Sequence, residues 1–260
     1  MTTVFEFTQL QAMLAALFWP FVRVGACLMV APVFGARFVP ARIRLMLSGA
    51  IALLIAPLTA QPTTALLSGD GVVITVQQLL IGAVLGFILQ MVFDAMGLAG
   101  QLLANGMGLG FAFNIDPLRG VSTPALGQLF IVLGTLLFLS MNGHLALLQL
   151  LADSFRVLPV EGGGLDLADW RRLADWGDSL FAGALRIALP GMTALIVVNL
   201  AFGIVSRAAP SLNLFAVGLP VTLVVGLVIV TLSLPGLQTS GTFMFGESFQ
   251  FVRGLLGGGR

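Results

Sequence analysis

The sequence predicts an all-α, polytopic helical membrane protein with long, kinked hydrophobic helices. Of its 260 residues, 58% are hydrophobic and 9% are charged, whereas a soluble domain carries roughly 25% charged residues. The mean hydropathy is +1.06. A helix that spans a bilayer needs about 20 mainly apolar residues, and the chain has room for six. These observations exclude an ordinary soluble domain.

Six apolar stretches follow one another along the chain. They run at about Leu10–Phe34, Leu45–Ala60, Val72–Leu103, Ala125–Leu151, Leu180–Val205 and Leu212–Leu234. The third covers 32 residues, and as a helix it would measure about 48 Å against a hydrocarbon core of about 30 Å. Such a helix either tilts or kinks in the bilayer or is covered by neighbouring subunits. Because the linkers are short, we expect one domain over residues 1–260.

The rare residue types limit the chemistry of this chain. Its 12 basic residues, all arginine, and 11 acidic residues give a formal net charge of +1, which favours no nucleic-acid partner. The arginines are divided evenly between the two sides of a six-span arrangement, so they predict no orientation. With one cysteine, Cys27, and one histidine, His144, we expect no disulfide within the chain and no conventional metal site. We also expect no cofactor and no catalytic site.

Three ionisable residues stand inside apolar stretches, namely Arg23, Asp94 and Arg186. Each would cost a few kcal/mol if it faced lipid, so each should face protein or water. One interpretation is that they brace helices or subunits, with Asp94 pairing with Arg23, with Arg186 or with another chain. The alternative is a small-solute secondary transporter that uses the three charges, because Pro20 and Pro190 place helix breaks beside the two arginines. The absence of an internal repeat argues against the transporter.

Glycines at helical spacing predict close contact between helices. Gly82 and Gly86 form a GxxxG pair on one helix face, and Gly97 and Gly100 follow further along. Without side chains, these positions let a second helix approach closely. The partner helix could belong to this chain or to another subunit.

The glycine-rich loop at about residues 105–120 is the most informative segment between the apolar stretches. It contains Gly106, Met107, Gly108, Leu109, Gly110, Phe111, Ala112, Phe113 and Asn114. A loop in water is ordinarily polar, and a loop in lipid would leave its main-chain groups without hydrogen bonds. We therefore expect this loop inside protein, either as a plug of a channel or as a passively buried loop. Methionine and phenylalanine would suit a seal, because they can repack around a changing lumen.

A polar insert at about residues 153–179 contains nine ionisable residues. Asp166 can cap a short helix whose apolar residues, including Trp170, recur at helical spacing. Trp170 and Trp176 suggest a surface at the membrane interface or towards a partner. The alternative is a solvated amphipathic connector. Carboxylates scattered in this way define no acid–base pair for catalysis.

Several motifs in order along the chain together resemble one known family. They are Phe18-Trp19-Pro20 with Arg23, Ala31–Gly35, Gln77–Gly82, Gly106–Phe111 leading to Asp116-Pro117, Asn142-Gly143-His144, Asn199–Gly203, and Ser206–Pro210 with Asn213. This set resembles the FliR family of flagellar type III export-gate subunits and, more distantly, its counterpart in virulence type III secretion systems. The resemblance covers nearly the whole chain and is weakest in the polar insert.

The resemblance implies a noncatalytic subunit of a hetero-oligomeric export gate in the bacterial inner membrane, within the flagellar basal body. One copy would join FliP-like and FliQ-like subunits in a short right-handed helical assembly, alongside FlhB-like and FlhA-like export components. The gate would conduct unfolded export substrates, and membrane lipid would surround part of it. The loop over Gly106–Asn114 would plug the channel beside a methionine seal from FliP-like chains. Asn199, Arg207 and Asn213 match family positions, and we interpret them as polar braces between helices or subunits.

Overall fold

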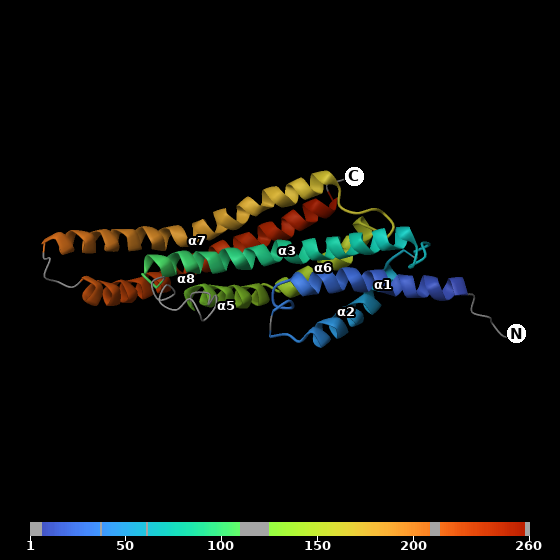
Figure 1. The fold of residues 1–260 in the computed structure, drawn as a ribbon, viewed down its shortest axis with the longest axis horizontal. Helices are drawn as coiled ribbons and strands as arrows, with labels where there is room; N and C mark the ends of the chain where they lie inside the picture. The colour runs from blue at the N-terminus through green and yellow to red at the C-terminus, as the bar shows by residue number, and fades with distance from the viewer. Residues whose placement is uncertain (1–6, 37, 61, 110–124, 209–213, 258–260) are drawn as a thin grey trace. The chain divides into compact units, whose positions relative to one another are not determined.

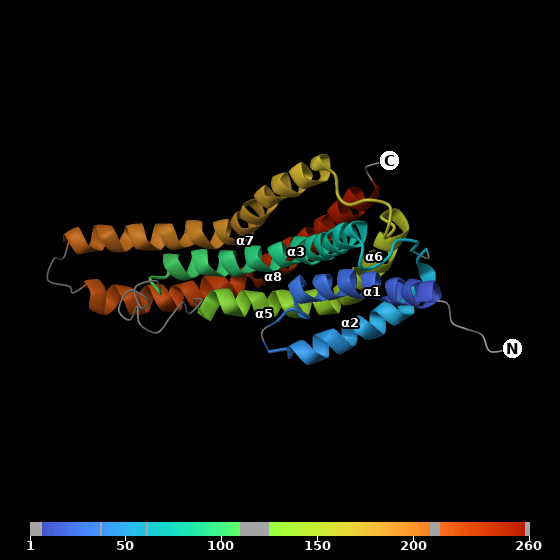
Figure 2. The same ribbon diagram turned by 45° about the vertical axis from the view of Figure 1, so that its right-hand side comes forward.

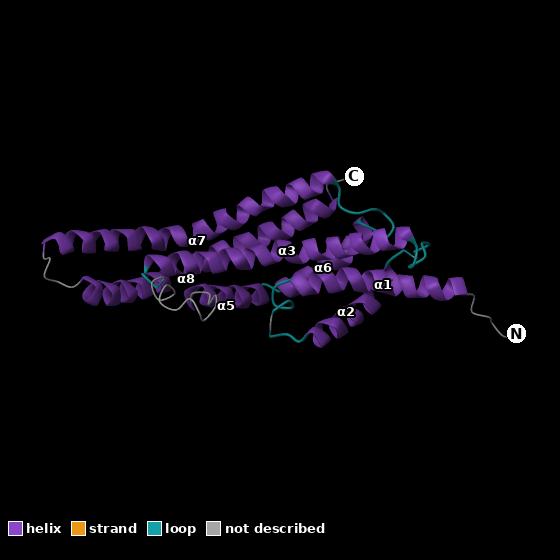
Figure 3. Ribbon diagram, viewed as in Figure 1, coloured by secondary structure: helices purple, strands orange, loops and turns teal. Residues whose placement is uncertain are grey.

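The computed structural model describes residues 7–36, 38–60, 62–109, 125–208 and 214–257, and within these ranges it is built from helices joined by loops (Figure 1, Figure 3). The α-helices are α1 (Phe7–Val30), α2 (Ala41–Ile55), α3 (Gly69–Gly106), α5 (Ala125–Ser140), α6 (Gly143–Val157), α7 (Leu167–Ala208) and α8 (Leu214–Gly257). A short 3₁₀-helix, η1 (Ala56–Leu58), continues α2. The predicted all-α class is confirmed.

Most of these helices could cross a membrane. Among the described residues, five helices are long and apolar enough to cross a membrane, or six when α5 and α6 count together as one span. The predicted polytopic character is therefore confirmed. The third helix is even longer than the apolar stretch predicts, since α3 has 38 residues and would measure about 57 Å if straight.

The polar insert differs from its prediction. We expected a short helix inside a connector, but the helix that begins at Leu167 continues without a break to Ala208 as α7. Its start is a reciprocal cap: the main-chain N–H of Asp169 donates to the Asp166 carboxylate at 2.8 Å, and the N–H of Asp166 donates to the Asp169 carboxylate at 3.2 Å. The predicted cap by Asp166 is confirmed, and the cap satisfies N–H groups that lack partners within the helix.

The fourth apolar stretch is divided into two helices. Between α5 and α6 lies Asn142, whose φ of 57° is left-handed. Asparagine is one of the few residues with a side chain that adopt this conformation readily. His144 follows in the first turn of α6. The apolar stretch predicted over Ala125–Leu151 therefore contains a bend of 67° between two helices, which hydropathy does not register because it comes from a single residue of reversed φ.

The last helix extends well beyond the predicted stretch. We expected it to end near Leu234, but α8 continues to Gly257 through Pro220 and Pro235. Proline removes one main-chain donor from a helix. Around Pro235, the hydroxyls of Ser233 and Thr239 donate to main-chain oxygens four residues earlier, at 2.7 and 3.0 Å. Local hydrogen bonding of this kind is typical of proline-containing membrane helices.

The helices are grouped into two compact units. Unit 1 comprises residues 1–91, 142–176 and 246–260, and unit 2 comprises residues 92–141 and 177–245. The helices α3, α7 and α8 contribute one part to each unit. A single export-gate domain over residues 1–260 stays a prediction.

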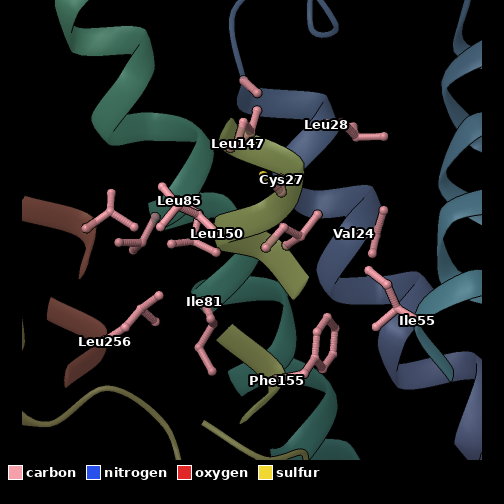
Figure 4. Close-up of a cluster of buried hydrophobic side chains, with 14 of the residues drawn as sticks. Val24, Cys27, Leu28, Ile55, Ile81, Leu85, Leu147, Leu150, Phe155 and Leu256 are labelled. Atoms are coloured by element: carbon pink, nitrogen blue, oxygen red, sulfur yellow. The ribbon is translucent and has the colours of Figure 1, made fainter. Parts of the chain in front are cut away.

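Unit 1 has an apolar core to which α1, the end of α2, α3, α6 and the end of α8 contribute. Figure 4 shows side chains from these helices meeting there. The labelled members are Val24, Cys27, Leu28, Ile55, Ile81, Leu85, Leu147, Leu150, Phe155 and Leu256. Cys27 is fully buried in this core, so it contributes packing. Helix α2 lies beside α1 in both ribbon views (Figure 1, Figure 2).

The GxxxG pair lies at the contact between α1 and α3 in unit 1. A Cβ atom at Gly86 would lie 2.6 Å from the carbonyl oxygen of Cys27, and one at Gly82 would overlap the carbonyl oxygen of Arg23. Only glycine permits this approach, since both obstacles are main-chain atoms of α1. The predicted close contact is confirmed, and its partner helix belongs to the same chain.

Unit 2 is organised around a cluster of aromatic rings. Phe93 of α3, Phe138 of α5 and Phe245 of α8 have ring centroids 5.4–5.6 Å apart, within the range of favourable aromatic pairs. Gly100 brings α3 onto α5, because a Cβ atom there would lie 2.6 Å from the carbonyl oxygen of Leu126.

Candidate functional site

The start of the glycine-rich loop is the part of that loop which the structure describes. Gly106 is the last residue of α3, and Met107, Gly108 and Leu109 form a turn after it. We call these four residues the loop base. The rest of the predicted plug, Gly110, Phe111, Ala112, Phe113 and Asn114, lies outside the described residues.

Two neighbouring helices hydrogen-bond to the loop base within unit 2. The side-chain amide of Asn199 in α7 donates to the carbonyl oxygen of Gly106 at 3.0 Å. The hydroxyl of Thr222 in α8 donates to the carbonyl oxygen of Met107 at 3.4 Å. The last carbonyls of a helix have no partner within it, so α7 satisfies one carbonyl at the end of α3 and α8 satisfies one in the turn that follows.

Packing also fixes the loop base. Met107 is 4% exposed and lies against Gly226 of α8, where a Cβ atom would overlap its side chain. Leu195 of α7 lies against Gly106, and Gly108 has a φ of 80°. That conformation suits glycine because it has no Cβ atom. The loop therefore starts from a well-packed end of α3.

Arg23 occupies a buried polar site in unit 1. Its guanidinium donates to the side-chain oxygen of Gln78 at 2.7 Å, to the hydroxyl of Ser154 at 3.1 Å and to the carbonyl oxygen of Leu158 at 2.8 Å. The ring of Phe155 lies 4.1 Å from the guanidinium carbon. Hydrogen bonds and a cation–π contact compensate for water lost by a charge that is fully buried.

This site joins three segments of unit 1. Arg23 belongs to α1, Gln78 to α3 and Ser154 to α6. The amide nitrogen of Gln78 also donates to the carbonyl oxygen of Val160 at 3.2 Å. Arg23 and Gln78 thus fix the chain that leaves α6. Arg23 thus connects α1, α3 and α6 of one chain, and its role as a brace stays a prediction.

The remaining predicted braces lie on the surface of the chain or outside the described residues. Asp94 of α3 and Arg186 of α7 are exposed and belong to unit 2, and the guanidinium carbon of Arg186 lies 4.8 Å from the ring centroid of Phe243. Asn199 is exposed beside its hydrogen bond to Gly106, and Arg207 is exposed near the end of α7. Asn213 lies outside the described residues.

Sequence reasoning missed the residues that complete these two sites. Gln78 and Ser154 accept hydrogen bonds from Arg23, and Thr222 and Gly226 contact Met107. Polar residues at apolar positions were the available signal for Gln78 and Ser154. For Gly226 there was no such signal, since the chain has 32 glycines.

A second polar contact joins two loops of unit 1. The carboxylate of Glu161 accepts hydrogen bonds from the main-chain N–H groups of Thr63 and Thr64, both at 2.7 Å, and from the Thr63 hydroxyl. Partial burial raises the pKa of Glu161, but the hydrogen bonds from Thr64 and Thr63 outweigh it, so the pKa lies below its usual value.

Large apolar side chains cover much of the surface. In the apolar stretch Ala41–Leu58, which comprises α2 and η1, only 17% of the residues are buried within the chain. Met46 and Leu54 of α2 are 75% and 74% exposed. Contiguous exposed apolar surface of this kind requires lipid or protein around it. Among the described residues, no group of three His, Cys, Asp or Glu side chains is placed to hold a metal ion.

Comparison with known proteins supports the motif resemblance. The model of the family described as bacterial export proteins, family 1, matches residues 14–248. The flagellar biosynthetic protein FliR of Pectobacterium carotovorum subsp. carotovorum is 39% identical over 92% of this chain and 92% of its own length. FliR of Escherichia coli strain K12 is 37% identical over 92% of both chains, and FliR of Buchnera aphidicola subsp. Acyrthosiphon pisum is 30% identical over 89% and 90%. With its membrane-spanning helices, this chain therefore belongs to the FliR family of bacterial export proteins and is a membrane component of flagellar export.

Proposed function

We propose that this chain is a noncatalytic subunit of the flagellar type III export gate, which forms and seals a protein-conducting channel for unfolded flagellar substrates. The observation that carries the proposal is the loop base. An apolar, glycine-rich loop leaves a helix end that Asn199 and Thr222 hydrogen-bond and that Gly226 packs against. An apolar loop with a fixed start can close a lumen at rest, and the conformational freedom of glycine allows it to move when a substrate arrives.

The proposal includes a hetero-oligomeric setting in the bacterial inner membrane. FliP-like and FliQ-like subunits would pack against this chain, alongside FlhB-like and FlhA-like export components. The exposed apolar helices supply surface for that packing. Energy for export would come from other components, since the sequence contains no phosphate-binding GxxxxGK[ST] motif.

The alternative, a small-solute secondary transporter, has less support. It needs Arg23, Asp94 and Arg186 along one water-filled path. Arg23 is fully buried, and its donors bond to Gln78, Ser154 and Leu158. A guanidinium engaged in this way is a structural brace and is poorly placed to receive a solute. The family of the chain also favours export.

Ion leakage tests the sealing role. In membranes that contain the assembled gate, deletion of residues 110–114 is expected to raise resting ion conductance, because the apolar loop is shortened while the loop base stays. A matched control removes residues 258–260 at the end of the chain. Unchanged conductance after the loop deletion, with normal assembly of the complex, would exclude the loop from sealing.

A further inference from the structure

Arg186 is an exposed charge in the apolar part of α7. It belongs to unit 2, and it is the only charged residue of the sequence between Asp178 and Arg207. This part of α7 lies in a segment that is long and apolar enough to cross a membrane. A charge in such a segment is strongly unfavourable where it faces lipid tails. Arg186 therefore needs a polar neighbour.

The chain itself supplies no anion for this arginine. In the part of the chain that the structure describes, the Arg186 guanidinium forms no hydrogen bond and no ion pair. Its guanidinium carbon lies 4.8 Å from the ring centroid of Phe243 in α8. This cation–π contact attracts the guanidinium to the ring, but it leaves the N–H donors without acceptors. The neighbour that Arg186 needs is thus a group outside this chain.

An apolar stripe continues from Arg186 along one face of α7. Leu189, Ile196 and Leu200 follow Arg186 at successive spacings of three, seven and four residues, which place side chains on one face of a helix. They are 52%, 62% and 64% exposed. A second helix packs along such a stripe by inserting its side chains between these residues. Lipid tails could cover the stripe but would leave Arg186 without an anion.

We infer that Arg186 forms an ion pair with a carboxylate on an apolar helix of another export-gate subunit, and that this helix packs along the stripe. The inference rests on the proposed function, because it needs the hetero-oligomeric gate. A guanidinium pairs with a carboxylate through two parallel hydrogen bonds, so the pair has a defined geometry. One such pair in an apolar contact fixes the register of the two helices. The apolar stripe alone would allow several registers.

An anionic lipid is the alternative source of negative charge. Arg186 lies eight residues after Asp178, which is about 12 Å along the helix, and the contact with Phe243 holds its guanidinium beside α8. A lipid phosphate stays at the level of the headgroups. A carboxylate on a packed helix can instead lie at any level of α7. The observations therefore favour a protein carboxylate.

Copurification of the assembled gate tests the ion pair. The full-length chain carries an affinity tag and is co-expressed with the FliP-like and FliQ-like subunits of the same bacterium. Arg186→Met and Arg186→Glu should each lower the amount of these subunits that copurifies by about tenfold or more, because the partner carboxylate loses its cation. The matched controls are Arg253→Met and Arg253→Glu, at an exposed arginine of α8, and they should change little.

Charge reversal identifies the partner residue. In the Arg186→Glu background, each Asp or Glu within an apolar segment of the other subunits is replaced by Arg in turn. One of these changes should restore copurification, since it re-forms the pair with its charges exchanged. This rescue depends on pairing, so it remains informative even if Arg186→Glu alone is less stable. If none of the changes restores copurification, the inference is wrong.

A lipid partner has a different outcome. Native mass spectrometry of the chain alone compares phosphatidylglycerol with phosphatidylcholine of identical acyl chains. If Arg186→Met assembles like the wild type but loses a preference for phosphatidylglycerol, a lipid phosphate faces Arg186 and the ion pair between subunits is wrong.

Failure of the inference differs from failure of the proposed function. If the wild-type chain copurifies with the other subunits and Arg186→Glu does so equally well, the gate stands and the ion pair is wrong. If the wild-type chain purifies without them, the proposed hetero-oligomeric gate and the ion pair are both wrong.

Discussion

The side-chain amide of Asn199 lies 3.0 Å from the carbonyl oxygen of Gly106 and donates a hydrogen bond to it. This contact joins α7 to the last residue of α3, at the point where the glycine-rich loop begins. The hydrogen bond therefore connects a polar residue of an apolar helix to the loop base.

Asn199→Leu should loosen the loop base. The substitution removes one hydrogen bond, worth about 0.5–1.5 kcal/mol, and leaves the Gly106 carbonyl without this partner. We expect a higher resting ion conductance of the assembled gate, measured in reconstituted membranes. Thr193→Val is the control, because the Thr193 hydroxyl is exposed and bonds within α7, to the Leu189 oxygen. Equal conductance in the two variants would contradict a role of Asn199 in holding the loop.

Gly226→Val should destabilise unit 2 by steric overlap with Met107. Overpacking typically costs about 1–3 kcal/mol, which should lower the midpoint of thermal unfolding in detergent. Gly236→Val is the control: it carries the same cost of a β-branched residue in α8, but outside the adjoining residues and backbone of α8 no atom lies within 4 Å of a Cβ atom there. An equal loss of stability in the two variants would exclude the overlap with Met107 as the cause.

The double variant Gly226→Val with Met107→Ala tests whether the loss of stability comes from overlap between these two residues. Removing the Met107 side chain creates room for valine, so the two changes should be less destabilising together than the sum of their separate effects. Thermal unfolding of the two single variants and the double variant measures the difference. Strict additivity would show that Gly226 and Met107 are not coupled.

Arg23→Met should destabilise unit 1 more than any exposed arginine substitution. It leaves Gln78, Ser154 and the Leu158 carbonyl without their donor, and an unsatisfied buried polar group costs about 1–3 kcal/mol. Denaturant unfolding in detergent measures the loss. Arg253→Met, at an exposed position of α8, serves as the comparison. A loss no greater than that of Arg253→Met would mean that the Arg23 hydrogen bonds contribute little net stability.

The Glu161 contact should add stability that depends on pH. Because its pKa is lowered in the folded chain, the contribution is present above the ordinary glutamate pKa of about 4.3 and is lost as pH falls through the lowered value. Glu161→Gln should therefore lower the unfolding midpoint at pH 7, and its effect should shrink as the pH falls below about 4.3. The loss should stay below about 1 kcal/mol, since the contact is exposed. A difference that persists unchanged to pH 3 would contradict this explanation.

Hydropathy predicted the fold class and that α3 is longer than a bilayer span requires. Both depend only on continuous runs of apolar residues, which are visible in the sequence. It failed where one residue or one local bond decides the path. Asn142 interrupts an apolar run through its left-handed φ, and α8 passes Pro235 with hydroxyl groups bonding to nearby carbonyls. Neither effect changes the mean hydropathy of a window.

The sites were predicted in part. Arg23 and Asn199 stood out as polar residues in apolar helices, and the glycine-rich loop stood out by composition. Their partners did not, because Gln78 is 55 positions from Arg23 and Gly106 is 93 positions from Asn199. A hydrogen bond depends on distance in space, which the order of residues alone does not give.

The sequence by itself determined that this chain is a helical membrane protein of the export family, since apolar composition and ordered motifs are properties of the linear chain. Only the tertiary structure decided which helix packs against Gly82 and Gly86, which acceptors surround Arg23, and which residues contact Met107. These outcomes depend on packing, in which a main-chain atom of one helix occupies the space that a missing side chain leaves on another.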